Sequence, residues 1–181
     1  WIEIDFPHMI ELKNKKLSGE KPRCKLERVA LDFSNHEAAR RTYADIGAKT
    51  KKALVITEGV IPYLTNDQAG QLARDLRAIP SFQLWIQDYR QGDQAWRNQS
   101  KVRNHLKNAP FQFRETDPFT FFGKLGWAVQ TDVNAIEEGE RLGRPFPIPF
   151  PWSLLTWLMP KKRITEFRQS MGYVMFRADG R

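Results

Sequence analysis

Four lone carboxylates follow short apolar segments in the first half of the chain, at Asp5, Asp32, Glu58 and Asp88. These segments resemble strands of an open α/β sheet, and the run before Glu58 is rich in β-branched residues. Ligands of such sheets bind outside the carboxyl ends of the strands. A carboxylate there can accept hydrogen bonds from both hydroxyls of a ribose, and it can also lie beside an ammonium or a sulfonium group. The pattern therefore indicates a nucleotide-type cofactor that is held by successive strand ends.

Each acid has a specific expected contact. Asp5 is placed to hold the ribose, whereas Asp32 is placed to accept from an adenine amine while the Phe33 N–H donates to a ring nitrogen. Glu58 is placed to contact an ammonium or a sulfonium group. The alternative is that each acid caps the following helix, whose N-terminus favours negative charge. For Asp5 and Asp32 both roles stay open, because Asp is also a preferred N-cap.

The elements that must position these acids alternate strictly between strand and helix. Two capping boxes, Ser34-x-x-Glu37 and Thr65-x-x-Gln68, predict the starts of the second and third helices. The run Ala53–Ile56 is typical of a strand that is covered on both faces. Strands are expected at 1–4, 26–31, 53–56 and 82–87. This order predicts an α/β fold with a parallel sheet and helices on both of its faces.

The pattern loosens after Arg90. We expect residues 90–170 to contain insertions on the substrate side or over the site, including a Pro-rich connector at 144–151. The other expected elements are a short helix after Asp117, a strand at 127–130, a helix that Asp132 caps, a helix from about 161 and a last strand at 171–177.

Composition excludes several classes of protein. The chain has 181 residues, 41% of them hydrophobic, and a formal net charge of +8. The single Cys24 rules out an internal disulfide framework and a Cys-based zinc site, so we expect no metal and a cytoplasmic setting. No segment resembles a membrane span or a signal peptide. The basic balance is compatible with a solvated surface, an acidic substrate or nucleic acid.

Several motifs together resemble the leucine carboxyl methyltransferase family of S-adenosylmethionine-dependent O-methyltransferases. The resemblance spans nearly the whole chain, and each motif is weak when taken alone. The motifs are Ile4-Asp5-Phe6-Pro7, Ile10-Glu11-Leu12-Lys13, Val29-Ala-Leu-Asp32-Phe33, Thr57-Glu58-Gly-Val-Ile-Pro-Tyr63-Leu64, Phe121-Phe-Gly-Lys-Leu-Gly126-Trp127, Gly143-Arg144-Pro145 and Gly172-Tyr173.

The resemblance implies a Rossmann-like methyltransferase fold with an antiparallel last strand near Tyr173, and S-adenosylmethionine as the cofactor. Asp5 would bind the ribose, Asp32 and Phe33 the adenine, and Glu58 the methionine end, while Tyr63 would help to wall the pocket. The family's first strand, its glycine-rich turn and an N-terminal helical arm are expected before Trp1. Residues 1–181 would then be a single methyltransferase domain that lacks its N-terminal part.

The implied activity is methyl transfer to a carboxylate or hydroxyl of a small molecule or peptide. Arg97 and His105, which follow the fourth strand, are candidates for the substrate side. Their alternatives are an exposed basic helix and a solvated histidine. Two other functions remain open: a non-catalytic remnant that serves as an interaction module, and an RNA-associated methyltransferase. The basic second half motivates the latter, although the chain contains no RNA-recognition motif.

Overall fold

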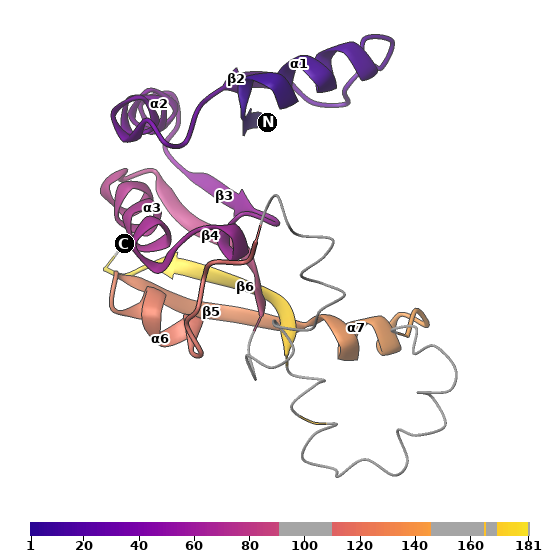
Figure 1. The fold of residues 1–181 in the computed structure, drawn as a ribbon, viewed down its shortest axis with the longest axis vertical. Coiled ribbons are helices and arrows are strands. Elements are labelled where there is room, and N and C mark those ends of the chain that lie inside the picture. Colours follow the sequence, from indigo (N-terminus) through magenta and orange to yellow (C-terminus); the bar gives the residue numbers. More distant parts are fainter. Residues whose placement is uncertain (91–109, 146–164, 166–169, 181) are drawn as a thin grey trace. The chain divides into compact units, whose positions relative to one another are not determined.

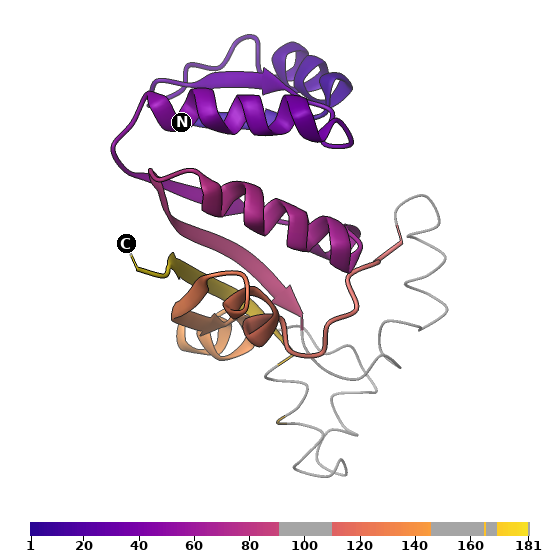
Figure 2. The same cartoon turned by 90° about the vertical axis from the view of Figure 1, so that its left-hand side faces the viewer.

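The computed structural model describes residues 1–90, 110–145, 165 and 170–180. The chain divides into two compact units, Trp1–Thr50 and Lys51–Arg181, and each is described separately (Figures 1 and 2). Among the described residues, no helix combines the length and the apolar character that crossing a membrane requires.

The first unit contains two parallel strands, each followed by a helix (Figure 1). The pairing register places Ile2 opposite Glu27 and Asp5 opposite Ala30. The Leu31 N–H then donates to the Asp5 carbonyl at 2.9 Å. Asp5 and the turn after β2 consequently lie at the same edge of this small sheet. The elements are β1 (Ile2–Asp5), α1 (Pro7–Lys16), β2 (Glu27–Ala30) and α2 (His36–Ala48).

The two helices of this unit begin differently from the sequence-based expectation. The N-cap of α1 is Phe6, which makes no side-chain capping bond, and Pro7 opens the helix because its missing N–H costs nothing there. The N-cap of α2 is Asn35, whose side chain accepts from the Ala38 N–H at 3.0 Å. The predicted capping box that begins at Ser34 is therefore wrong, because the next residue is itself a strong cap and takes the position.

The second unit contains a four-stranded sheet in the order β3-β4-β6-β5. Strands β3 and β4 are parallel, whereas β6 is antiparallel to both of its neighbours. The mixed sheet and the antiparallel last strand confirm the predicted α/β class. The elements are β3 (Ala53–Thr57), the 3-10 turn η1 (Ile61–Tyr63), α3 (Asn66–Ala78), β4 (Phe82–Arg90), α6 (Pro118–Gly123), β5 (Trp127–Asn134), α7 (Ala135–Arg141) and β6 (Met171–Ala178).

Caps set the helix starts of this unit as well. The box formed by Thr65 and Gln68 opens α3, as predicted. Asp117 caps α6 by accepting from the Thr120 N–H at 3.0 Å. The N-cap of α7 is Asn134 rather than the expected Asp132, because β5 continues through Asp132 to Asn134.

Aromatic residues form the core of the second unit on the side of the sheet that α3 and α6 cover (Figure 2). The Trp85 ring lies 5.1 Å from Phe122, 5.2 Å from Trp127 and 6.0 Å from Phe176, measured between centroids. The Trp127 indole N–H donates to the carbonyl of Ala73 on α3 at 3.0 Å. All four rings are fully buried, and this packing fixes β4, β5 and β6 against each other.

The opposite face of β3 is open among the described residues. Leu54 and Ile56 are 47% and 43% exposed, whereas Val55 between them is half-buried. The expectation that this strand is covered on both faces is therefore not met by the described part of the chain. The alternation of side chains along a strand accounts for the difference, since hydrophobicity alone does not reveal which face has a covering layer.

Candidate functional site

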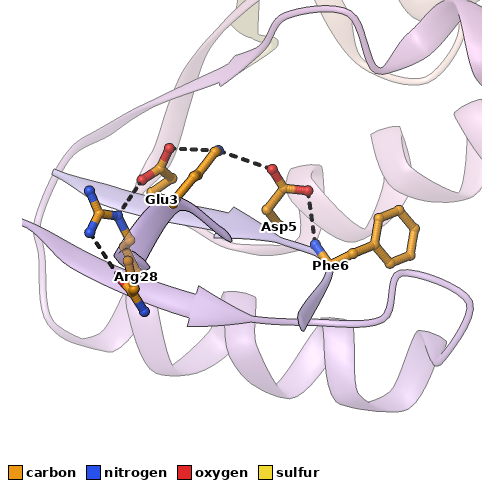
Figure 3. A network of polar contacts seen from close by, with 6 residues as sticks. Glu3, Asp5, Phe6 and Arg28 are labelled. Atoms are coloured by element: carbon orange, nitrogen blue, oxygen red, sulfur yellow. Dashed lines mark hydrogen bonds and ion pairs between the residues drawn. The ribbon is translucent and has the colours of Figure 1, made fainter. Parts of the chain in front are cut away.

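Asp5 ends β1 inside a network of charged side chains (Figure 3). Its Oδ1 accepts from the Phe6 N–H at 2.9 Å, and its Oδ2 accepts from Lys13 Nζ at 3.0 Å. The same ammonium donates to Glu3 Oε1 at 2.7 Å, while Arg28 Nε donates to Glu3 Oε2 at 2.9 Å. Two cations thus hold two carboxylates that stand on one face of β1.

Hydrogen bonds within the network favour the charged forms of Glu3 and Lys13. The hydrogen bond from Lys13, followed by the one from Arg28, lowers the pKa of Glu3. The hydrogen bond to Glu3, followed by the one to Asp5, raises the pKa of Lys13. Each oxygen of an ionised carboxylate can accept a second hydrogen bond, so Asp5 keeps acceptor capacity for a ligand. Sequence reasoning missed Glu3 and Lys13, although the two-residue spacing of Glu3 and Asp5 already places both on one face of the strand.

Asp32 is exposed and organises the turn after β2. Its Oδ1 accepts from the Ser34 N–H at 2.9 Å and from the Ser34 hydroxyl at 2.7 Å, and these bonds lower the pKa of Asp32. Its carbonyl accepts from the Asn35 N–H at 3.0 Å. Within the described ranges, Asp32 Oδ2 has no hydrogen-bond partner. Asp32 therefore does not serve as the N-cap of α2, which is Asn35.

Two aromatic rings lie beside the same strand ends. Phe33 is half-buried, and its ring meets the Phe6 ring edge to face at a centroid distance of 5.5 Å. Phe6 in turn stacks on His8 at 5.9 Å. The turn after β1 and the turn after β2 are thus in direct contact. Asp5, Asp32 and Phe33 belong to one edge of the first unit.

Glu58 follows β3 in the second unit and accepts from a tyrosine far along the chain. The Tyr173 hydroxyl on β6 donates to Glu58 Oε1 at 3.0 Å, and this bond is the main cause of the raised pKa of Tyr173. The next residue, Gly59, has a φ of 64°, and its N–H donates to Asp88 Oδ1 at 2.8 Å. Asp88 and Tyr173 stand opposite each other in the β4–β6 register. Glu58 and Asp88, two of the four acids, therefore share one cluster with Tyr173.

Of the three residues predicted for the substrate side, Tyr63 is the one that the structure describes. Tyr63 is half-buried in η1, and its ring lies 5.2 Å from that of Phe111. Its carbonyl accepts from Gln112 Nε2 at 2.9 Å. Arg97 and His105 lie outside the described residues. In the part of the chain that the structure describes, no group of three or more His, Cys, Asp or Glu side chains is arranged to hold a metal ion.

The N-terminal part of the chain matches a known family model. The model is described as leucine carboxyl methyltransferase, and it matches residues 1–77. A putative S-adenosyl-L-methionine-dependent methyltransferase of Mycobacteroides abscessus is 25% identical over 162 residues, a match that covers 79% of this chain and 52% of the relative. The chain therefore spans about half the length of that curated relative.

Several solved methyltransferases share the fold. The mitomycin 7-O-methyltransferase has a TM-score of 0.53 at 11% identity and covers 98% of this chain and 41% of its own. The magnesium protoporphyrin IX methyltransferase of Synechocystis PCC 6803 with bound SAH has a TM-score of 0.52 at 10% identity. The match covers 98% of the present chain and 64% of that methyltransferase. A complex between the Haloferax volcanii Trm112 methyltransferase activator and a putative methyltransferase has a TM-score of 0.57 at 10% identity. This match covers 98% of the present chain and 71% of the matched chain.

Identities this low establish the fold alone, which is the Rossmann-like fold of S-adenosylmethionine-dependent methyltransferases. The family match rests on the segment that contains β1, β2, β3 and the acids Asp5, Asp32 and Glu58. Residues 1–77 are thus similar to the leucine carboxyl methyltransferase family, and the described fold is that of S-adenosylmethionine-dependent methyltransferases.

Proposed function

We propose that the protein is an S-adenosylmethionine-dependent O-methyltransferase that acts on a carboxylate or hydroxyl of a small molecule or peptide. The observation that carries the proposal is the pair of strand ends in the first unit. Asp5 is the last residue of β1 and Asp32 follows β2, and the two strands are parallel neighbours. The match of residues 1–77 to the leucine carboxyl methyltransferase model supports the same reaction, and so does the similarity to a putative S-adenosyl-L-methionine-dependent methyltransferase.

The acids have separate roles in this proposal. Asp5 accepts hydrogen bonds from the ribose hydroxyls. The hydrogen bond that Lys13 Nζ donates to Asp5 Oδ2 restricts the orientation of this carboxylate. Asp32 accepts from the adenine amine through the oxygen that the Ser34 turn leaves open, and the Phe33 N–H donates to the adenine ring. A charge-assisted hydrogen bond of this kind contributes about 1.5–3 kcal/mol.

Glu58 contacts the methionine end of the cofactor. Its carboxylate is exposed, which leaves it open to an ammonium group, and the Tyr173 hydroxyl restricts its orientation. Tyr63 belongs to the same segment and contributes to the wall of the pocket. Arg97 and His105 stay predictions for the substrate side.

The reaction is an in-line displacement at the sulfonium methyl. The methyl group passes to the acceptor oxygen, and the sulfur keeps the electron pair, which leaves S-adenosylhomocysteine. The enzyme supplies positioning and exclusion of water. A carboxylate acceptor needs no general base, whereas a hydroxyl acceptor must also lose its proton. The cytoplasmic setting and the single-domain organisation remain predictions from the sequence.

Calorimetric titration of the full-length protein with S-adenosylhomocysteine tests the proposal. We expect binding, and we expect Asp5→Asn to weaken it by about 1.5–3 kcal/mol because a charged acceptor of the ribose hydroxyls is lost. The matched control is Asp45→Asn, which changes an exposed carboxylate on α2 and should leave the affinity unchanged. Absence of binding to the wild-type protein, or equal affinities for the Asp5 variant and wild type, would contradict the proposal.

A further inference from the structure

A small cavity lies at the carboxyl end of β4 within the second unit. Its volume is about 20 Å³, and its lining includes Ile61, Gln87, Phe113 and Pro118, all of them buried. The half-exposed residues Arg90 and Phe111 also line it and therefore mark its outer side, with the Arg90 guanidinium 5.1 Å from the centre of the Phe111 ring. Apolar surface predominates in the lining, which also includes the polar residues Gln87, Asp88 and Arg90.

One buried polar atom in this lining has no hydrogen-bond partner among the described residues. Gln87 is 1% exposed, and its Oε1 accepts no hydrogen bond from any described residue. Buried polar groups are nearly always paired, because an unmet acceptor carries its full desolvation cost. Such an exception in a native fold requires an explanation. Gln87 alternates with Trp85 and Tyr89 on the buried face of β4, so its side chain cannot reach water by a change of rotamer alone.

The size and chemistry of the cavity limit the occupant. A volume of about 20 Å³ admits one water-sized group and excludes a ring. A buried water needs two to four polar partners, and Gln87 Oε1 is the unpaired buried side-chain acceptor found in the described ranges. A hydroxyl or amino group that is carried on an apolar body needs only one acceptor, since its covalent attachment replaces the other contacts. The cavity therefore has room for the polar end of a ligand, and the Gln87 acceptor is available to bind it.

The position of the cavity connects it to the proposed reaction. Asp88 lines it, and the same carboxylate accepts from the N–H of Gly59, the neighbour of Glu58. We propose that this cavity is an anchoring subsite for the methyl acceptor and takes one hydroxyl or amino group on an apolar or aromatic body. The inference rests on the proposed methyl-transfer function, in which Glu58 contacts the methionine end of the cofactor. Gln87 binds the acceptor here and takes no part in the methyl transfer.

Phenol and toluene are suitable probes because they differ mainly in a hydroxyl group against a methyl group. We expect phenol to bind the wild-type full-length protein roughly tenfold more tightly than toluene, the ratio for one hydrogen bond. The shifts of the Tyr89 and Phe113 backbone amides in NMR titrations report binding at the cavity. The discrimination should disappear in Gln87→Met, which keeps the side-chain length and removes the acceptor. Gln83→Met, at a half-buried position on the same strand, should retain it.

Three results of the titrations would overturn the subsite. These are equal shifts by both probes in the wild type, persistence of the discrimination in Gln87→Met, and absence of amide shifts up to the solubility limit of phenol. A crystal structure with a water on Gln87 Oε1 and on two further protein groups would also overturn it. Titration with S-adenosylhomocysteine is independent of these readouts. If the wild-type protein did not bind S-adenosylhomocysteine but still discriminated phenol from toluene through Gln87, the methyltransferase proposal would be rejected. The cavity would then remain a binding site for a hydroxyl group.

Discussion

At the scale of single residues, Lys13 joins two carboxylates that have different expected roles. Glu3 is paired with Arg28 as well and stabilises the strand pair, whereas Asp5 is the proposed ribose acceptor. One ammonium group therefore couples the stability of the first unit to the orientation of a cofactor ligand. The charges involved give this coupling a definite dependence on pH.

Replacing Lys13 with Met should lower the free energy of unfolding by about 1 kcal/mol at pH 7, because two partly exposed ion pairs are lost. The lowered pKa of Glu3 means that its contribution is complete above the unfolded value of 4.5 and is lost as the pH falls through the folded value. The raised pKa of Lys13 means that its contribution is complete below 10.5 and is lost as the pH rises through its folded value. The difference from wild type should therefore be largest between these limits.

Urea unfolding at a series of pH values measures this difference. Lys16→Met is the matched control, since Lys16 is exposed on the same helix and forms no ion pair with any described residue. A Lys13 variant whose stability followed wild type across the whole pH range would show that the network contributes nothing to folding.

At the scale of elements, helix starts were harder to predict than strands. The six strands of the described residues begin within one residue of their predicted starts, because runs of β-branched and aromatic residues are local signals. The end of β5 was predicted at 130, whereas the strand continues to Asn134. Around α2, three candidate caps occur within four residues, at Asp32, Ser34 and Asn35, and spacing alone does not rank them. The structure assigns the cap to Asn35, while Asp32 and Ser34 form the turn before it.

The two roles predict different costs of substitution. Asn35→Ala should destabilise the protein by about 1 kcal/mol, because the Ala38 N–H loses its acceptor. Ser34→Ala removes one exposed hydrogen bond to Asp32 and should change stability by less than about 0.5 kcal/mol. Thermal unfolding of both variants measures the contrast. A larger loss for Ser34→Ala would restore the capping box that the sequence suggested.

The candidate site was predictable only in part, for a physical reason. Acids at strand ends can be recognised locally, so Asp5, Asp32 and Glu58 could be named from the sequence. Contacts between distant segments carry no local signal. The hydrogen bond from Tyr173 to Glu58 joins residues 115 positions apart. The burial of Gln87 Oε1 depends on the packing of residues 61–62 and 111–118 around β4.

At the scale of the whole molecule, the proposal assigns contacts with one cofactor to residues that are far apart in the sequence. These residues are Asp5, Asp32, Phe33 and Glu58. A bound ligand must protect each segment that it contacts from local opening. The effect of ligand binding on hydrogen exchange therefore tests the assignment without reference to catalysis.

Saturating S-adenosylhomocysteine should slow exchange at the amides of Phe33 and Gly59 together. At a ligand concentration of 100 times Kd, the stabilisation by mass action is about 2.7 kcal/mol, which corresponds to roughly 100-fold slower exchange of protected amides. Exchange mass spectrometry or NMR measures it, and the exposed Leu142 at the end of α7 serves as the reference. Slowing at only one of the two amides would remove either the adenosine contact or the Glu58 contact from the proposal.

The place of β6 in the sheet affects how the protein is made. It is the last of the described strands in the sequence, yet it lies between β4 and β5 and pairs with both. Gly172 permits this position, since a Cβ atom there would stand 2.3 Å from the Val133 carbonyl oxygen and 2.7 Å from the Tyr89 hydroxyl. During synthesis, the edges of β4 and β5 that pair with β6 therefore stay unpaired until residues 171–178 have left the ribosome. A nascent chain stalled before this strand would expose the Trp85 and Trp127 surfaces and become a target for chaperones.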